Sequence, residues 1–453
     1  MRWRTISKAG LAVSCVALAG CLPTGDGSEG AGASVSRFLQ NPGQVLSNDA
    51  AAQAALSETE RATQRPDGTA SPIIEDLAER RSILPKGSSY DKVARAVLTS
   101  SSRIAEAELR GAHLRAQAAK YNWLPQLGPS ISLSSLGDFV TSLVVEQVLF
   151  DNGRKRAERD YARFDVEKAA VTLSQDSNDR VHDALSLFLA AEEGRARSAI
   201  SERSLSDMGH FEWIMNERVK GGISDMSDLN VIRQKLAEIR AQQSSAQAAI
   251  RTAEAELAAM AGAPVSGISG VPDFRVTGGG RVPLSVLLAE TERDLAVAQA
   301  TVARAQHLPG LSARGTLTAN NSSGAITAGG DTFFGIGTGA SLKAIDAERD
   351  AATRRVAQAR EDANRKIAAL DQQMAGLGAQ LMQARTLATQ AKANLDLFQS
   401  QYKGGARQVM DVVGVYETWA RQSESVVTKT FELERLRIDK ARALGILADG
   451  GLI

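Results

Sequence analysis

The tripeptide Lys-Gly-Gly stands twice in this chain, as Lys220-Gly221-Gly222 and as Lys403-Gly404-Gly405, 183 residues apart. Each copy leads to an aspartate in the same relative place, within Ser227-Asp228-Leu229 after the first and within Met410-Asp411-Val412 after the second. Two glycines in a row favour a tight reversal of the chain, and an acidic residue shortly afterwards favours the start of a helix. The pattern therefore predicts two helical hairpins that turn in the same way.

A second matched pair supports a duplication. Leu124-Pro125-Gln126-Leu127 and Leu308-Pro309-Gly310-Leu311 recur at an offset of 184 residues. One offset shared by two unrelated local patterns predicts an internal repeat, in which each half builds the same parts. The expected order in each half is a helix, a break at proline, two short strands, a very long helix, the Gly-Gly turn and a further long helix.

The first repeat begins with a helix expected from about Ser89 to Asn122, which ends before Pro125. Alternating Ser and apolar residues predict a strand over about 128–136, and Phe139–Phe150 predicts its return partner. Beyond Asp151-Asn152-Gly153 nothing breaks the helical pattern until about Val219, so we expect a helix of roughly 100 Å. A second helix is expected to continue to about Ala261.

The second repeat is expected to copy this plan. After a loop over 262–283 we expect a helix to about Gln306, a strand at Leu311–Ala319 and a loop at Asn320–Asp331. The return strand is expected at Phe334–Leu342, with Phe333-Phe334 at the rim of the sheet, and helices are expected at Ile345–Tyr402 and Arg407–Leu447. The triple glycine at 278–280 is interpreted as a linker, because no strand-to-helix context or following Lys-Ser/Thr makes it a phosphate loop.

A strict spacing of three and four residues marks both hairpins. It runs from Ile367 to Tyr402 without a miss, and from Ile232 to Met260 with one polar residue, Gln243. A seven-residue apolar repeat of this length indicates a left-handed coiled coil. The hairpins are therefore expected to be rods that pack along a seam.

The start of the chain predicts export and lipidation. Basic residues at positions 2, 4 and 8 precede an apolar run over 9–19, which is typical of a secretory signal and too short to span a bilayer. Leu18-Ala19-Gly20-Cys21 resembles the bacterial lipobox, which implies cleavage before Cys21 and its acylation, for example with palmitate. The alternative is an ordinary signal peptide with a chance cysteine, as Cys15 also occurs there. Leu22 in place of aspartate favours the outer membrane.

Composition excludes several classes of function. A net charge of +1 spread along the chain argues against a nucleic-acid partner. Beyond Cys21 no cysteine is left for a disulfide, and the four histidines stand far apart, which argues against a metal site. No carboxylate pair, activated nucleophile or cofactor motif is present, so we expect neither an enzyme nor a cofactor. An aromatic content of 4% suits long packed helices.

Four strands of about nine residues are long enough to cross a bilayer but too few to close a barrel. An open edge in lipid would leave backbone groups unpaired, so several chains must pool their strands. Three chains would supply twelve. The Ser, Thr and Arg314 side chains are expected to face a water-filled lumen.

The stretch from about Ser88 to Leu447 resembles the TolC-type outer-membrane export channels. The motifs that carry the resemblance are Leu124-Pro125-Gln126-Leu127, Leu149-Phe150-Asp151-Asn152-Gly153-Arg154, and Tyr402-Lys403-Gly404-Gly405-Ala406-Arg407 followed by Met410-Asp411-Val412. The resemblance implies a mixed α and β fold: a homotrimer with a shared 12-stranded transmembrane β-barrel, four strands per chain, continued by a long periplasmic α-helical coiled-coil barrel. It also implies a passive exit duct that works with a periplasmic adaptor and an inner-membrane pump.

The same resemblance implies a gate at the helical tips. By position, Tyr402 and Arg407 match the family's gate tyrosine and arginine, and Ser227 and Asp228 match the Thr-Asp pair that they bind. Asp411 matches the first of two aspartates that ring the constriction, whereas the second is Gly414 here, which puts cation selectivity in doubt.

A simpler interpretation exists for the same residues. Asp228 and Asp411 begin helices after turns, where capping and the helix dipole favour acidic residues. Gly221, Gly222, Gly404 and Gly405 are expected to serve the tip turns in either case.

The expected organisation is a signal peptide at 1–20, a lipid-anchored tether at 21–87, repeat 1 at 88–262, a linker at 263–283, repeat 2 at 284–448 and a tail at 449–453. A short helix within the tether is possible at Asp49–Arg65. The expected function is an outer-membrane exit duct for small molecules. Two alternatives remain open: the outer-membrane component of type I protein secretion, and a periplasmic coiled-coil lipoprotein without a pore.

Overall fold

The structure is a computed structural model that describes residues 71–100, 104–133, 139–265, 267–276, 280–318, 321–329 and 335–452. All of them belong to one compact unit, Thr59–Ile453. Several expectations lie outside these residues: the signal peptide, Cys21, the helix at Asp49–Arg65, and Phe333-Phe334.

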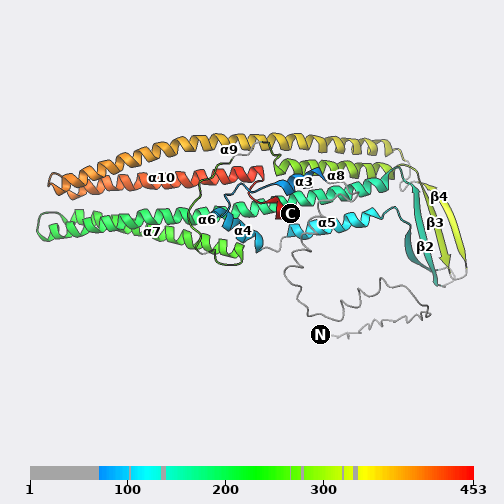
Figure 1. Cartoon of the computed structure of the whole chain (residues 1–453), viewed down its shortest axis with the longest axis horizontal. Helices are drawn as coiled ribbons and strands as arrows, with labels where there is room; N and C mark the ends of the chain where they lie inside the picture. Colours follow the sequence, from blue (N-terminus) through cyan, green and yellow to red (C-terminus); the bar gives the residue numbers. More distant parts are fainter. Residues whose placement is uncertain are drawn as a thin grey trace, which may run out of the picture. The chain divides into compact units, whose positions relative to one another are not determined.

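Two long helical hairpins dominate the fold (Figure 1). The first consists of α6 (Arg154–Lys220) and α7 (Met226–Ala261), and the second of α9 (Thr338–Lys403) and α10 (Val409–Leu444). The helices of each hairpin run side by side in Figure 1 and pack along their length, and α6 also packs against α10. Within the part of the chain that the structure describes, no helix is long and apolar enough to cross a membrane. The predicted hairpins and their Gly-Gly turns are confirmed.

The seams predicted from the heptads are confirmed by burial. Leu370, Leu381, Ala384, Ala391 and Leu395 of α9 are buried, and the remaining seam residues of that helix are at least partly covered. On α7, Ile232, Leu236, Ala253 and Leu257 are buried, and Gln243 is only partly covered. Because the burial keeps the seven-residue spacing, each pair of helices wraps along one continuous contact.

The sheet is antiparallel with strand order β1-β2-β3-β4. Its strands are β1 (Gln126–Leu133), β2 (Phe139–Phe150), β3 (Gly310–Thr318) and β4 (Ser322–Gly329). The first three agree with the predicted strands. A β-bulge interrupts the β2–β3 pairing between Val148 and Phe150. Strands β1 and β4 form the two edges.

The predicted return strand of repeat 2 is wrong. The expected loop at Asn320–Asp331 contains β4, and the segment expected as a strand contains the start of α9 at Thr338. The hairpin closes tightly, because Thr318 N donates to Asn321 O at 2.8 Å and Leu317 pairs with Ser322. Every residue of β4 is exposed. A strand that buries neither face lacks the apolar alternation by which sequence reasoning finds strands.

The first predicted helix is also wrong in one respect, because it is divided. It forms α4 (Ser89–Thr99) and α5 (Ile104–Lys120) instead of one helix to Asn122. Ser100 caps α4, and its hydroxyl donates to Met260 O at the end of α7. Serine and threonine compete with the helix for backbone hydrogen bonds, which explains why the run Thr99–Ser102 breaks it.

The segment before α4 is folded, although we expected it to be tether. Helix α3 (Pro72–Glu79) packs against α6, and Arg80 behind it is 1% exposed. The Arg80 guanidinium donates to Asp76, to Val282 O before α8 (Leu284–Gln306), and to Leu444 O and Gly445 O at the end of α10. A buried guanidinium is tolerated only with such a set of acceptors. Arg80 thus joins three separate parts of the chain.

Backbone bonds extend this junction. Ile83 N donates to Ile446 O, and Gly450 N, at the start of the short 3-10 helix η1 (Gly450–Leu452), donates to Arg80 O. A Cβ on Gly450 would lie 1.8 Å from Leu77 O, so only glycine fits there. The expected linker contributes as well, since Phe274 is buried and meets the Tyr90 ring edge-on at 5.5 Å.

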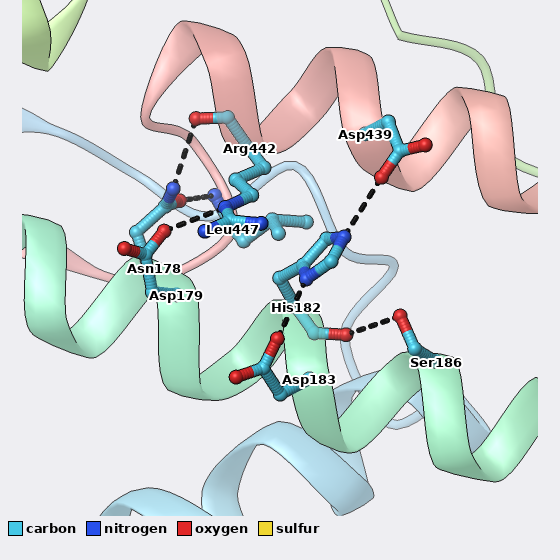
Figure 2. Close-up of polar contacts among 8 residues, drawn as sticks. All are labelled: Asn178, Asp179, His182, Asp183, Ser186, Asp439, Arg442 and Leu447. Atoms are coloured by element: carbon cyan, nitrogen blue, oxygen red, sulfur yellow. Dashed lines mark hydrogen bonds and ion pairs between the residues drawn. The ribbon is translucent and has the colours of Figure 1, made fainter.

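A second polar junction ties α6 to α10, and Figure 2 shows it. Asn178 donates to Arg442 O and accepts from Leu447 N, both at 2.9 Å. One turn further along α6, the His182 ring lies between Asp183 and Asp439, with Nε2 2.8 Å from Asp439 Oδ1. Arg442 pairs with Asp179 beside them. The hydrogen bond to Asp439 raises the pKa of His182, although its burial opposes the shift.

We predict that His182→Gln destabilises the protein in acid more than in alkali. Because the pKa of His182 is raised on folding, its contribution is complete below the unfolded pKa of about 6.5 and is lost as pH rises through the folded pKa. A loss of about 1 kcal/mol near pH 5.5 and less near pH 8.5 is expected. Urea unfolding at both pH values measures it, with His210→Gln on the exposed side of α6 as control. An equal loss at both pH values would contradict the assignment.

Candidate functional site: the hairpin tips and the two-faced sheet

The two tip turns have the same backbone geometry. Gly221, Gly222 and Ile223 donate their N–H groups to the carbonyls of Glu217, Val219 and Arg218. Gly404, Gly405 and Ala406 do the same with Ser400, Tyr402 and Gln401. These bonds satisfy the last carbonyls of α6 and α9, as in a Schellman-type helix end.

Only the second glycine of each turn needs to be glycine for its backbone conformation. Gly222 and Gly405 have φ values of 71° and 76°, whereas Gly221 and Gly404 have φ values of −83° and −82°. Positive φ is costly for a residue with a Cβ.

An apolar cluster behind the turns joins the two hairpins. Its buried members come from all four long helices and include Met208, Leu229, Leu395 and Tyr416. Two polar contacts accompany it. Tyr416 on α10 donates its hydroxyl to Ser204 on α6 at 3.3 Å, and Lys235 Nζ on α7 lies 3.5 Å from Glu417 Oε1 on α10. Sequence reasoning missed these links, although Lys235 and Glu417 flank seam positions, where coiled coils place ion pairs between helices.

Asp411 acts as a cap in the structure. Its Oδ2 accepts a hydrogen bond from Gln408 N at 3.2 Å, and the Gln408 side chain in turn binds the Asp411 backbone. This is a reciprocal capping box at the start of α10. The Asp411 side chain is nonetheless exposed at the tip. The structure therefore supports the capping role directly and leaves the carboxylate accessible.

Arg407 lies on its own turn. Its Nε donates to Gln401 Oε1 at 3.1 Å, and its guanidinium carbon lies 4.5 Å from the centre of the Phe398 ring. The first hairpin has a matching link 183 residues earlier, where Arg218 Nε donates to Ser224 Oγ at 3.1 Å. The donor and acceptor positions are exchanged between the two hairpins, but each link bridges the same turn.

The other expected gate residues are not brought together within the subunit. Tyr402 is half-buried and packs on the tip cluster, Ser227 is exposed, and Asp228 is half-buried in the first turn of α7. Among the described residues, no hydrogen bond or ion pair joins Tyr402 or Arg407 to Ser227 or Asp228. Any such link would therefore have to form with another chain or in another state.

The motifs beside the sheet meet where strand gives way to helix. Asp151 accepts from Gly153 N and Lys155 N, and so caps α6. Asn152, in the left-handed region at φ 54°, donates its side-chain amide to Pro309 O. A Cβ on Gly310 would lie 2.9 Å from Phe150 O, so the chain passes closely there. Residues from both repeats thus form one junction.

The sheet has a polar face and an apolar face. Cross-strand partners share a face, so the pairings of Ser130 with Ser142, Ser142 with Thr318 and Glu146 with Arg314 define the polar one. The opposite face carries Leu127, Ile131, Leu143, Leu317 and Ile326, of which Ile131 and Ile326 are 71% exposed. An apolar sheet face that nothing in the chain covers indicates contact with an apolar medium or partner.

Aromatic side chains gather at the end of the sheet nearest the helices. Tyr121, Trp123 and Phe150 are 61%, 58% and 58% exposed. Gln147, on the apolar side of β2, donates to Trp123 O, which places this segment beside that face.

Comparison with solved structures follows from this geometry. No family model matches the chain, and no curated protein matches its sequence. The fold is similar to a membrane protein from Pseudomonas aeruginosa, with a TM-score of 0.71 and 17% identity over 82% of this chain and 92% of that chain. It is also similar to the outer membrane protein VceC from Vibrio cholerae, with a TM-score of 0.67 and 17% identity over 79% and 96%.

The Campylobacter jejuni CmeC outer membrane channel gives a TM-score of 0.66 at 12% identity, over 79% of this chain and 86% of that chain. Identities this low show the fold and not the activity. The chain therefore has the fold of the TolC-type outer-membrane channels, as its motifs predicted.

We predict that Gly405→Ala loosens the second tip whereas Gly404→Ala does not. Alanine at φ 76° costs about 1–2 kcal/mol, because its Cβ crowds the backbone. At Gly404 φ is ordinary, and an added Cβ would meet only normal van der Waals contacts. Limited proteolysis at the tip measures the difference. Equal protease sensitivity of both variants would show that the turn does not depend on positive φ.

Proposed function

We propose that three copies of this chain form an outer-membrane export duct, a passive exit for molecules delivered from the periplasm. One observation carries the proposal, namely the sheet whose two edges are unpaired and whose faces differ in polarity. Strands of 8 to 12 residues suit a tilted membrane-spanning strand. In lipid the edges β1 and β4 must pair with other chains, because unpaired backbone groups there are costly.

Three subunits would give a barrel of twelve strands. The apolar face would then contact lipid and the polar face would line the lumen. The exposed residues Tyr121, Trp123 and Phe150 support this orientation, because aromatic side chains favour the membrane–water boundary. Helix α6, with 67 residues, is about 100 Å long and would extend into the periplasm.

The finer assignments also belong to the proposal. The chain consists of two repeats, at 88–262 and 284–448, and is anchored to the outer membrane by acylation of Cys21. Its tips meet a periplasmic adaptor, which links the duct to an inner-membrane pump. The matching turns at Gly222 and Gly405 support the duplication. The fold shared with outer-membrane channels supports the location.

The small-molecule duct is the first candidate, and polypeptide export by a type I system is the second. The described residues favour neither cargo. A coiled-coil lipoprotein without a pore accounts for the seams, but it leaves the exposed apolar face of the sheet without a purpose.

The test is conductance of the purified full-length protein in a planar bilayer, together with its mass in detergent. A trimer that conducts supports the duct. A trimer or monomer that never conducts, even after disruption of the tips, would favour the spacer.

We predict that Asp411→Asn weakens block of the channel by multivalent cations applied from the tip side. Three exposed carboxylates near one axis would attract such cations, and asparagine removes that charge. Its side-chain oxygen can still accept from Gln408 N, so the cap of α10 is preserved. Asp225→Asn at the tip of the first hairpin is the control. Unchanged block in single-channel recordings would leave Asp411 with its capping role alone.

We predict that Arg407→Ala raises the conductance several-fold. The substitution removes the hydrogen bond to Gln401 and the contact with Phe398, and so loosens the second tip. Arg218→Ala removes the matching link of the first hairpin and separates a gate from general weakening of the tips. If both variants conduct like the wild type, Arg407 does not hold the duct closed.

A further inference from the structure

One layer of the polar sheet face is charged. Glu146 on β2 and Arg314 on β3 are directly paired in the register, and Arg314 NH2 lies 2.7 Å from Glu146 Oε2. Gln126 on β1 and Ala325 on β4 continue the same layer on either side. The layer therefore reads Gln-Glu-Arg-Ala across the four strands.

This pair stands alone on the sheet. Among the strand residues that the structure describes, Glu146 and Arg314 are the only ionisable side chains. Their neighbours on the same face are small or uncharged, for example Ser142, Val144, Ser312 and Thr316. The two side chains keep exposed fractions of 39% and 57% despite the contact. Both therefore present their charge to whatever occupies the space over the polar face.

The layer lies near the helical end of the sheet. Glu146 and Ser312 line a cleft together with Asp151 and Arg154 at the start of α6. Glu146 is followed by only four residues of β2. In the proposed duct this position is where the helical tunnel would open into the barrel.

We propose that the Glu146–Arg314 pair is a charge-balanced ring that sets the ion selectivity of the barrel, an inference that rests on the proposed function. In a trimer, three carboxylates and three guanidinium groups would face one lumen at one level. Because they pair within each subunit, the ring carries no net charge and rejects neither anions nor cations. Loss of either partner converts it into a ring of three like charges.

The range of such charges is sufficient to act on a passing ion. Twelve strands spaced about 4.8 Å apart and tilted by about 40° enclose a cylinder roughly 24 Å across. Arginine and glutamate side chains reach inward from that wall. At 0.01 M salt the screening length is about 30 Å, so an ion anywhere in the cross-section feels the ring. At 1 M salt it is about 3 Å, and the effect should vanish.

The experiment measures reversal potential across a tenfold KCl gradient at low salt, with full-length protein in a planar bilayer. Glu146→Gln should shift selectivity toward chloride, and Arg314→Gln should shift it toward potassium, each changing the permeability ratio by about two-fold or more. The exchange E146R/R314E keeps the pair and should return the ratio to the wild-type value. All shifts should disappear in 1 M salt. The same series in an Asp411→Asn background removes any contribution from the tips.

The control is the pair of Arg115 on α5 and Asp165 on α6, which has a similar distance of 2.7 Å but lies outside the sheet. Asp165→Asn and Arg115→Gln should leave the ratio unchanged. Channels that conduct with no opposite shift between the two sheet variants would overturn the ring and leave the duct intact. Absence of conductance in the wild type and in every variant would reject the duct itself.

Discussion

The seams between the long helices are the contacts on which the remaining structure depends. The sheet and the tips are attached to opposite ends of α6 and α9, and neither helix could stay straight in water over this length without a partner. The packing of α7 on α6 and of α10 on α9 supplies that partner. A regular seven-residue spacing keeps the buried stripe on the same side of each helix from end to end. Small residues such as Ala384 and Ala391 keep the helices close.

The tips show how one residue can satisfy two demands. Asp411 completes a capping box and still exposes its carboxylate, and Arg407 bridges its own turn while lying on the surface. A cap is required in any helical hairpin, so the resemblance to a gate rests on position and not on contacts within the subunit. The contacts that do join the hairpins, Tyr416 with Ser204 and Lys235 with Glu417, lie beside the apolar cluster. The physical coupling of the two hairpins is therefore behind the turns.

The sequence predicted those features whose signal is periodic. The heptads of α7 and α9, the alternation in β3 and the glycine turns are local patterns that tertiary structure has little freedom to override. Strand β4 was missed because it buries no face, and the break after Thr99 was missed because the helical pattern resumes at Ile104. The position of Arg80 could not be predicted, because its acceptors come from residues more than 200 positions away. The same reason hid the pairing of Glu146 with Arg314.

The environment of Arg80 has a consequence for biogenesis. Its acceptors include Leu444 O and Gly445 O, and its own carbonyl is bound by Gly450 N. During synthesis the segment around α3 emerges early, but the groups that neutralise its guanidinium exist only after residue 450 has been added. Until then Arg80 cannot be buried without a large penalty, so the junction between α10 and α8 has to assemble after translation. A nascent chain held unfolded until completion, as secretion across a membrane requires, is compatible with this order of events.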